Sequence, residues 1–209
     1  RSSDLISDYT ELLMPDDLLS GDSILAYTRE AMTPDVCSDV EVIGWLYQFY
    51  IAEKKDEVFE GIKKNKKVTP ENIPAATQLF TPNWIVRYMV QNSLGRLWKL
   101  NNPDSKLEME YYIEPETKES DYLKISSPKE LKICDPACGS GHILVYAFDL
   151  LYEIYKEAGY SDDDDIIENI LTHNLYVIEI DERASELASF ALTMKAAAKS
   201  SSKRRFFKK

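Results

Sequence analysis

Apolar residues recur at helical spacing in two stretches of the first half of the chain. Over residues 40–62 they fall at i, i+4, i+7 and i+8, which predicts one amphipathic helix. Three aromatic residues of this helix are expected to fill a core: Trp45, Tyr47 and Phe49. A second helix is expected after Pro82, with Thr81 capping its free amides. One face of this second helix is lined by Ile85, Val86, Met89, Val90, Leu94 and Leu97.

Two later runs have the character of strands. Residues 131–134 and 175–180 are short, apolar and each followed by a helical pattern, at 143–155 and 184–198 respectively. Both runs are apolar enough to be buried on two faces, as strands of parallel sheets are. An extra helix is expected between them, over residues 164–172.

The segments between these elements have the composition of connections. Residues 68–78 contain Pro70 and Pro74 and are expected to form a linker, and residues 101–129 a connection with a short hairpin at 111–113. The pattern therefore predicts an α/β fold. We expect a helical N-terminal segment over residues 1–68 and a second domain over residues 69–209.

Charge and composition exclude several classes of protein. The net charge of the 209 residues is -11, which argues against a protein that coats DNA, because phosphate binding needs clustered Lys and Arg. The basic runs 63–67 and 203–209 are expected to be solvated surface. The acidic run 162–165 is expected to cap the helix that follows it rather than to bind a metal ion.

Cysteine, histidine and hydropathy give further expectations. Three cysteines and two histidines do not make a spaced zinc pattern, so we expect reduced thiols, a cytoplasmic protein and no metal site. No stretch approaches the roughly 18 to 20 apolar residues of a membrane span. The chain begins with Arg1 and lacks a signal-peptide pattern, so we expect a piece excised from a longer protein.

The clearest chemical motif follows the first strand and reads Asp135-Pro-Ala-Cys-Gly139-Ser-Gly141. Glycines allow positive φ and close approach of a ligand to the backbone, and the helix start offers unpaired amides. A carboxylate at the strand tip would repel phosphate but suits an ammonium group. Because His142 stands where a phosphate-binding loop has lysine, the motif favours S-adenosylmethionine over a phosphorylated nucleotide.

The second strand also ends in acidic residues. Glu179 is the candidate to accept the ribose hydroxyls of a nucleoside, and Asp181 is expected to cap the next helix. Ile180 has two readings, packing on an adenine ring or packing in the core. Cys138, inside the glycine loop, is expected to be a small packing residue rather than a redox thiol.

Taken together, the segments Gln78-Leu-Phe-Thr81-Pro-Asn-Trp, Asp135-Pro-Ala-Cys-Gly-Ser-Gly and Tyr176-Val-Ile-Glu179-Ile-Asp resemble gamma-class adenine-N6 DNA methyltransferases, in particular the PglX-like type of BREX phage-resistance systems. The resemblance covers residues 40–209. It implies a partial Rossmann-like fold in which Thr81 holds the methionine carboxylate of S-adenosylmethionine, Asp135 faces the methionine end and Glu179 binds the ribose. The implied cofactor-binding set is Phe80, Thr81, Asp135, Pro136, Ala137, Gly139, Ser140, Gly141, Glu179 and Ile180.

The catalytic element of that family is not in the sequence. It is an Asn- or Asp-Pro-Pro-Tyr or Phe loop that binds a flipped adenine, and no such tetrapeptide occurs here. The resemblance therefore implies the cofactor-binding portion, without catalytic residues, of an enzyme of a restriction-modification or BREX-type defence system that methylates double-stranded DNA. Because two of the family's seven strands are present, the open sheet edge leads us to expect a dimer or a swapped oligomer.

Two other functions stay open. The same loop occurs in enzymes that methylate glutamine or RNA. In a different class, the chain would be a cofactor-sensing or protein-docking module that contacts other defence-system proteins through its acidic residues 1–60.

Overall fold

The structure is a computed structural model that describes residues 17, 20–38, 41–79, 81–117 and 119–201. The chain forms two compact units, residues 1–42 and residues 43–209, and each is described here by itself. In the first, Ser23 caps α1 (Ile24–Ala31) by accepting from the Ala26 amide at 3.2 Å, and a 3-10 turn, η2 (Val36–Ser38), follows. The predicted domain boundary at residues 68 and 69 stays a prediction.

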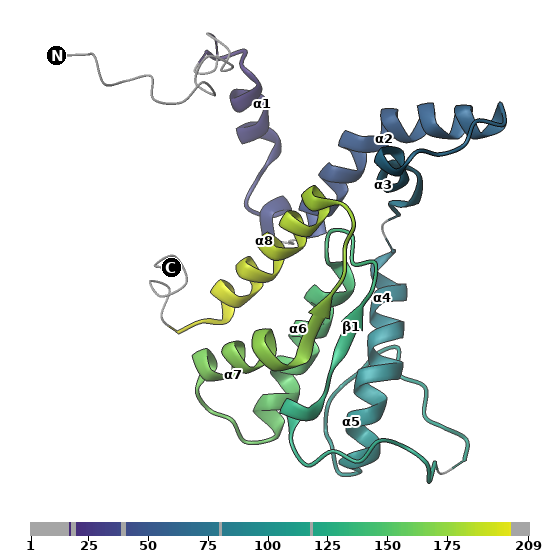
Figure 1. Cartoon of the computed structure of the whole chain (residues 1–209). Coiled ribbons are helices and arrows are strands. Elements are labelled where there is room, and N and C mark those ends of the chain that lie inside the picture. Colours follow the sequence, from purple (N-terminus) through teal and green to yellow (C-terminus); the bar gives the residue numbers. More distant parts are fainter. Residues whose placement is uncertain (1–16, 18–19, 39–40, 80, 118, 202–209) are drawn as a thin grey trace. The chain divides into compact units, whose positions relative to one another are not determined.

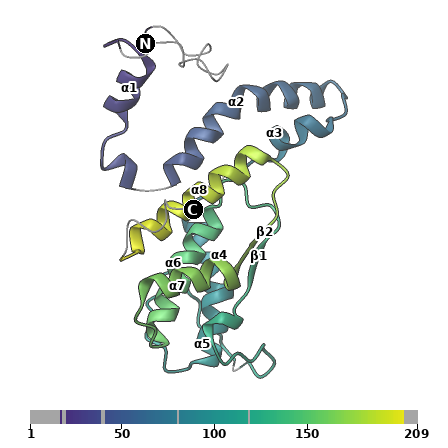
Figure 2. The same cartoon turned by 60° about the vertical axis from the view of Figure 1, so that its left-hand side comes forward.

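The second unit is mostly helical and contains a small sheet (Figures 1 and 2). Its elements are α2 (Glu41–Lys63), η3 (Pro70–Asn72), α3 (Ile73–Thr77), α4 (Asn83–Val90), η4 (Gln91–Gly95), α5 (Arg96–Asn101), η5 (Pro128–Glu130), β1 (Ile133–Asp135), α6 (His142–Glu157), α7 (Asp163–Asn169), η6 (Ile170–Asn174), β2 (Leu175–Val177) and α8 (Glu182–Lys199). The segments η4 and η6 are π-helical.

The strands β1 and β2 pair in parallel, with Asp135 opposite Val177. Hydrogen bonds continue past the strand ends, where the Ile178 amide donates to the Asp135 carbonyl at 2.9 Å and the Cys138 amide donates to the Ile178 carbonyl at 3.3 Å. This sheet confirms the mixed α/β character. The expectation of strands buried on both faces is wrong for both strands, because Cys134 in β1 and Tyr176 and Val177 in β2 are exposed. The sheet in the described residues has only two strands.

The core is built on α6, which packs against both α4 and α8. Its apolar residues Phe148, Leu151 and Ile154 are completely buried. The face that α4, η4 and α5 turn to this core consists of residues four apart: Val86, Val90, Leu94 and Trp98. The prediction of this face is confirmed for Val86, Val90 and Leu94, but it is wrong for Met89, which is 48% exposed.

The helix predicted over residues 40–62 is confirmed as α2, but its aromatic residues do not fill a core. Phe49 is 75% exposed and Trp45 is 40% exposed, while Tyr47 is half-buried. The predicted linker at 68–78 is also wrong, because η3 and α3 form there. Pro74, in the first turn of α3, lacks an N–H that the helix start leaves unused in any case.

The hairpin predicted at 111–113 is wrong as well. The backbone there bonds to side chains of η4 instead of a second strand: the Tyr111 amide donates to Gln91 Oε1 at 2.6 Å, and the Ile113 amide donates to Asn92 Oδ1 at 2.8 Å. The side chains of Gln91 and Asn92 therefore take the place of a strand partner.

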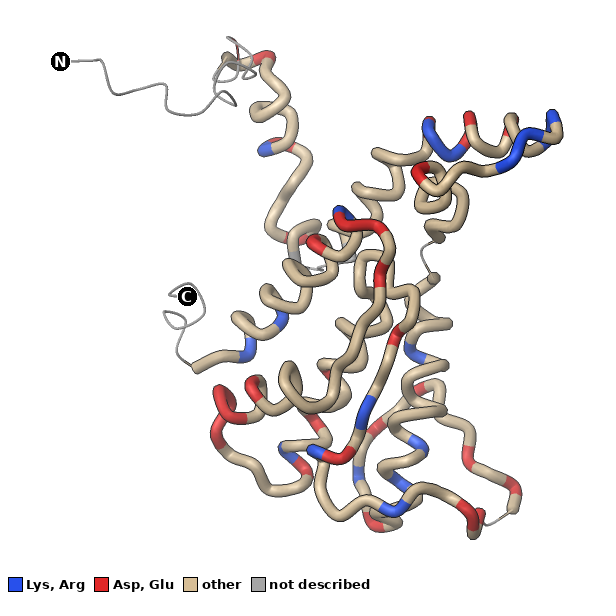
Figure 3. Tube along the Cα trace, in the orientation of Figure 1, with Lys and Arg blue, Asp and Glu red and all other residues tan. Residues whose placement is uncertain are grey.

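Figure 3 shows where acidic residues lie along the backbone, and two of those that the sequence singled out cap helices. Asp162 accepts from the Asp164 and Asp165 amides at 2.9 and 3.2 Å, and Asp181 accepts from the Arg183 amide at 3.2 Å. Both caps are confirmed. The cap predicted for Thr81 is wrong, since α4 begins after Pro82 and no side chain caps it. Among the described residues, no helix is long and apolar enough to cross a membrane.

Candidate functional site

The loop after β1 is shaped by two glycines with left-handed backbone conformations. Gly139 has φ +55° and Gly141 has φ +84°, values that side-chain-bearing residues seldom adopt. A Cβ atom at Gly141 would lie 2.9 Å from the Cβ of Ala188, so the absence of a side chain lets the loop pack directly on α8. Around Gly139 the space is open within 4 Å. The loop thus presents bare backbone at Gly139 and packs tightly at Gly141.

Asp135 is the last residue of β1, and one of the two oxygens of its buried carboxylate has no hydrogen-bond partner among the described residues. Its Oδ1 accepts from the Ala137 amide at 3.1 Å, which closes the first turn of the loop. Its Oδ2 is buried and has no hydrogen-bond partner among the described residues. A buried carboxylate oxygen in this state is stabilised by a cationic or hydrogen-bond-donating ligand.

Glu179, which follows β2, binds the backbone of the loop that follows β1. Its Oε2 accepts from the Gly139 amide at 2.7 Å, and its Oε1 accepts from the amides of Ile180 and Asp181 at 2.9 and 3.0 Å. One carboxylate therefore joins the tip of β2 to the glycine loop. It fixes the relative position of the two strand ends.

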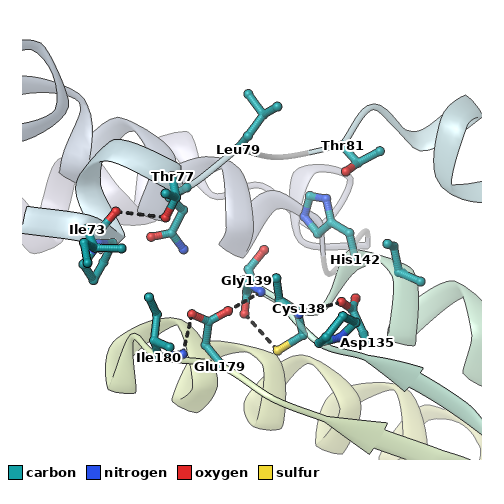
Figure 4. A pocket seen from close by; sticks show the side chains of 16 residues that line it. Ile73, Thr77, Leu79, Thr81, Asp135, Cys138, Gly139, His142, Glu179 and Ile180 are labelled. Carbon is teal, nitrogen blue, oxygen red and sulfur yellow. Dashed lines mark hydrogen bonds between the residues drawn. The ribbon is translucent and has the colours of Figure 1, made fainter. Parts of the chain in front are cut away.

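These strand ends form the floor of a cavity of about 350 Å³, a size within the range of small-molecule sites (Figure 4). Eight of the sequence-predicted residues line it: Thr81, Asp135, Pro136, Ala137, Gly139, Ser140, Glu179 and Ile180. Gly141 is not among the lining residues and packs on Ala188 instead. Phe80 lies outside the described residues.

Sequence reasoning missed the part of the cavity wall that comes from α3 and from Gln78, the residue that follows this helix. Ile73, Pro74, Thr77 and Gln78 line the cavity, as does His142 at the start of α6. Gln78 and Ser140 are buried, and neither Gln78 Oε1 nor Ser140 Oγ has a hydrogen-bond partner among the described residues. The signal in the sequence was the closeness of Gln78 to the Phe-Thr-Pro motif, three residues before Thr81.

Cys138 is the packing residue that the sequence predicted. It is buried with Leu144 and Ala188 in a small apolar cluster. Burial, and after it the nearby carboxylates of Glu179 and Asp135, raises the pKa of its thiol to about 11. At neutral pH the group is therefore a protonated thiol, not a nucleophilic thiolate.

The helix α2 is attached to the rim of the cavity through polar side chains. The Tyr47 hydroxyl donates to the carboxylate of Asp181, and burial together with this bond raises the pKa of Tyr47. The Arg183 guanidinium lies 6.0 Å from the centre of the Tyr50 ring. Lys55 Nζ donates to the Gln78 carbonyl at 2.8 Å. These contacts attach α2 to Gln78 in the cavity wall and to Asp181 and Arg183, which lie just after the cavity residue Ile180. The bond to Asp181 explains why Tyr47 is half-buried.

Comparison with known proteins gives the relatives of the chain. Residues 117–208 match the family described as MmeI, DNA-methyltransferase domain. The chain is 49% identical over 201 residues to adenine-specific methyltransferase BrxX of Escherichia coli O9:H4 (strain HS), covering 91% of this chain and 16% of that protein. It is 39% identical over 206 residues to adenine-specific methyltransferase PglX of Lacticaseibacillus casei (strain Zhang), covering 90% of this chain and 17% of that protein.

A third relative is more distant. A putative type II restriction enzyme and methyltransferase of Methanocaldococcus jannaschii is 29% identical over 140 residues, covering 54% of this chain and 11% of that protein. The chain thus spans about a sixth of the length of the two nearer relatives. The family resemblance inferred from the three motifs is confirmed.

Proposed function

Because the chain belongs to the family of the adenine-specific methyltransferases BrxX and PglX, we propose that it forms the S-adenosylmethionine-binding portion of a DNA adenine-N6 methyltransferase. In this proposal the two strands and their helices are part of a Rossmann-like methyltransferase domain. The remaining strands, the catalytic loop and the target recognition domain belong to other parts of the whole protein. The described chain contributes cofactor binding and no catalytic residue.

The observation that carries the proposal is the free oxygen of Asp135. A buried carboxylate whose Oδ2 has no partner among the described residues, in the wall of a cavity, favours a ligand that brings positive charge or N–H donors. The amino-acid end of S-adenosylmethionine has an ammonium group, whereas ATP and NAD would bring phosphates to the same carboxylate. When bound, this cofactor supplies an electrophilic methyl group on its sulfonium. Thr81, at the same end of the cavity in Figure 4, supplies a hydroxyl for the cofactor's carboxylate.

Glu179 can accept fewer hydrogen bonds from the ribose hydroxyls than the sequence suggested. A carboxylate has about four lone-pair sites, and backbone amides use three of those on Glu179. The remaining site, on Oε2, accepts one ribose hydroxyl beside the Gly139 amide. A second hydroxyl requires the bond between Gly139 and Glu179 to open.

The whole protein, in this proposal, transfers the methyl group to N6 of adenine in double-stranded DNA. It acts in a BREX-type phage-defence system together with other proteins of that system. The adenine specificity in the names of the two nearer relatives supports this assignment over methylation of glutamine, and the match to a DNA-methyltransferase domain supports it over methylation of RNA. Self-association of the isolated chain through the uncovered edge of its sheet stays a prediction.

Isothermal titration of the chain with S-adenosylmethionine tests the proposal, with two matched variants. Asp135→Asn keeps the size of the side chain but removes its charge, and it is expected to weaken binding about tenfold to hundredfold, the range of a charge-assisted hydrogen bond. Asp149→Asn removes a carboxylate that accepts from Lys195 Nζ at 2.7 Å on α6, away from the cavity. It should leave binding unchanged. Equal affinity of the wild type and Asp135→Asn would contradict the proposal.

A further inference from the structure

Gln78 is held in place by its backbone while its side chain lacks a partner. Its amide donates to the Pro74 carbonyl at 2.9 Å, and its own carbonyl accepts from Lys55 Nζ at 2.8 Å. The residue is only 8% exposed, and its Oε1 is buried without a hydrogen-bond partner among the described residues. An acceptor in this state is an energetic cost unless a ligand supplies a donor.

Gln78 borders two cavities: a second one with charged residues that include Asp181 and Arg183, and the site cavity, whose wall near Gln78 is apolar. Ile73 and Pro74 on α3 and Ile180 after β2 line the same cavity, and Ile73 and Ile180 present 37% and 68% of their surfaces. The hydroxyl of Thr77 is already used, because it donates to the Ile73 carbonyl at 2.9 Å. This end of the cavity therefore combines apolar walls from two elements with one carboxamide that is ready to bond.

The two ends of the cavity differ in chemistry. In Figure 4, Ile73, Thr77 and Ile180 lie at one end, while Thr81, His142 and Asp135 lie at the other. Glu179 lies next to Ile180 and so borders the apolar end. A ligand with a polar, charged tail and a flat heteroaromatic ring fits this division, with its ring between Ile73 and Ile180.

We infer that Gln78 is the residue that recognises the adenine ring of the methyl donor, with Oε1 accepting a hydrogen bond from the exocyclic amine. This inference rests on the proposed function. A carboxamide matches adenine well, because its oxygen accepts from the amine while its NH2 group can donate to a neighbouring ring nitrogen. Ile73, Pro74 and Ile180 supply the apolar contact with the ring faces. Gln78 thereby selects for a base that carries an amine.

The experiment compares two ligands by isothermal titration: S-adenosylmethionine and its analogue with unsubstituted purine as the base, which lacks only the exocyclic amine. The wild-type chain is expected to bind the analogue about tenfold more weakly. Gln78→Leu is expected to bind both ligands with similar affinity, because the acceptor is gone. Thr193→Val is the matched control, because the Thr193 hydroxyl donates to the Ser189 carbonyl at 2.8 Å within α8 and the residue lies outside the cavity lining. This variant should keep the tenfold preference. Gln78→Met, which is unbranched, replaces Gln78→Leu if that variant does not fold.

The outcomes separate this inference from the proposed function. If the wild type binds S-adenosylmethionine but does not distinguish the purine analogue, the role of Gln78 is overturned and the proposed function stands. The same holds if the Gln78 variants retain the full preference for the amine. If the wild type binds neither ligand, both the proposed function and this inference fail.

Discussion

The Gly139 amide donates to the carboxylate of Glu179 at 2.7 Å, across forty residues of sequence. This bond joins a glycine loop that follows one strand to the tip of the neighbouring parallel strand. Because the same carboxylate also accepts from the amides of Ile180 and Asp181, it organises the floor of the cavity before any ligand is present.

We first predict the effect of Glu179→Gln. The glutamine keeps one acceptor oxygen but loses the charge and turns an NH2 group toward backbone amides. We expect unfolding to become easier by about 1 to 3 kcal/mol and the affinity for S-adenosylmethionine to fall about tenfold. Urea denaturation and calorimetric titration measure the two effects. Unchanged stability would show that the hydrogen bonds of Glu179 with the amides of Gly139, Ile180 and Asp181 do not stabilise the two strand ends.

The glycines of the loop are predicted to tolerate alanine unequally. Gly141→Ala should destabilise the chain by about 2 to 5 kcal/mol, because it combines positive φ with a Cβ atom 2.9 Å from Ala188. Gly139→Ala should cost about 1 to 2 kcal/mol, since its φ is positive but its surroundings are open. Gly159→Ala is the control, because Gly159 has φ +92° with nothing within 4 Å and lies outside the loop. Urea denaturation of the three variants checks the order, and equal costs at Gly139 and Gly141 would contradict the packing argument.

Asn174 is predicted to be a key structural residue. It is fully buried, its Nδ2 donates to the carbonyls of Pro128 and Leu131 at 2.8 and 2.6 Å, and its Oδ1 accepts from the Tyr155 hydroxyl at 3.0 Å. Asn174→Leu should cost about 2 to 4 kcal/mol, because it leaves buried acceptors unsatisfied.

Tyr155→Phe is the matched comparison, because it removes a single bond to the same asparagine. It should cost only about 1 kcal/mol. Chemical denaturation gives both values, and a larger loss for Tyr155→Phe than for Asn174→Leu would refute this account of the Asn174 bonds.

Thiol reactivity is predicted to separate the cysteines. Cys37 and Cys134 are exposed, whereas burial raises the pKa of Cys138 to about 11 from an ordinary value of 9.0. Since the thiolate is the reactive form, iodoacetamide at pH 8 should alkylate Cys37 and Cys134 and spare Cys138. Because the pKa of Cys138 is higher in the folded chain than in the unfolded chain, its neutral thiol contributes fully to the free energy of unfolding below pH 9. This contribution is lost as the pH rises toward 11.

Mass spectrometry of the digested, alkylated chain identifies the modified residues. A Cys138→Ala variant serves as the control for the pH dependence, because it should lose less stability than the wild type between pH 9 and 11. Rapid alkylation of Cys138 in the folded chain would be incompatible with its burial.

The sequence predicted the floor of the cavity well for a physical reason. Asp135 ends β1, Gly139 lies in the loop after it and Glu179 follows β2. The carboxyl ends of parallel strands meet at one edge of the sheet. The caps at Asp162 and Asp181 were equally predictable, since short acidic side chains bond the amides of their own helix start. These features depend on residues close in sequence or on a single strand pairing.

The features that sequence reasoning missed depend on contacts between distant segments. The side chains of Gln91 and Asn92 replace the predicted hairpin partner of residues 111–113, and no periodicity signals such a bond. The two prolines of 70–74 suggested a linker, although Pro74 begins α3. Gln78 begins the segment that resembles the family, but no role was predicted for it, because the pattern of an uncharged polar residue near prolines does not reveal that the side chain is buried.

The most direct test of the central claim is equilibrium dialysis of the wild-type chain with radiolabelled S-adenosylmethionine, with and without an excess of ATP or NAD. Our account predicts binding of one molecule per chain that neither phosphorylated nucleotide displaces, because Asp135 faces the ligand with a buried negative charge. Displacement by ATP or NAD, or the absence of any retained radiolabel, would contradict it.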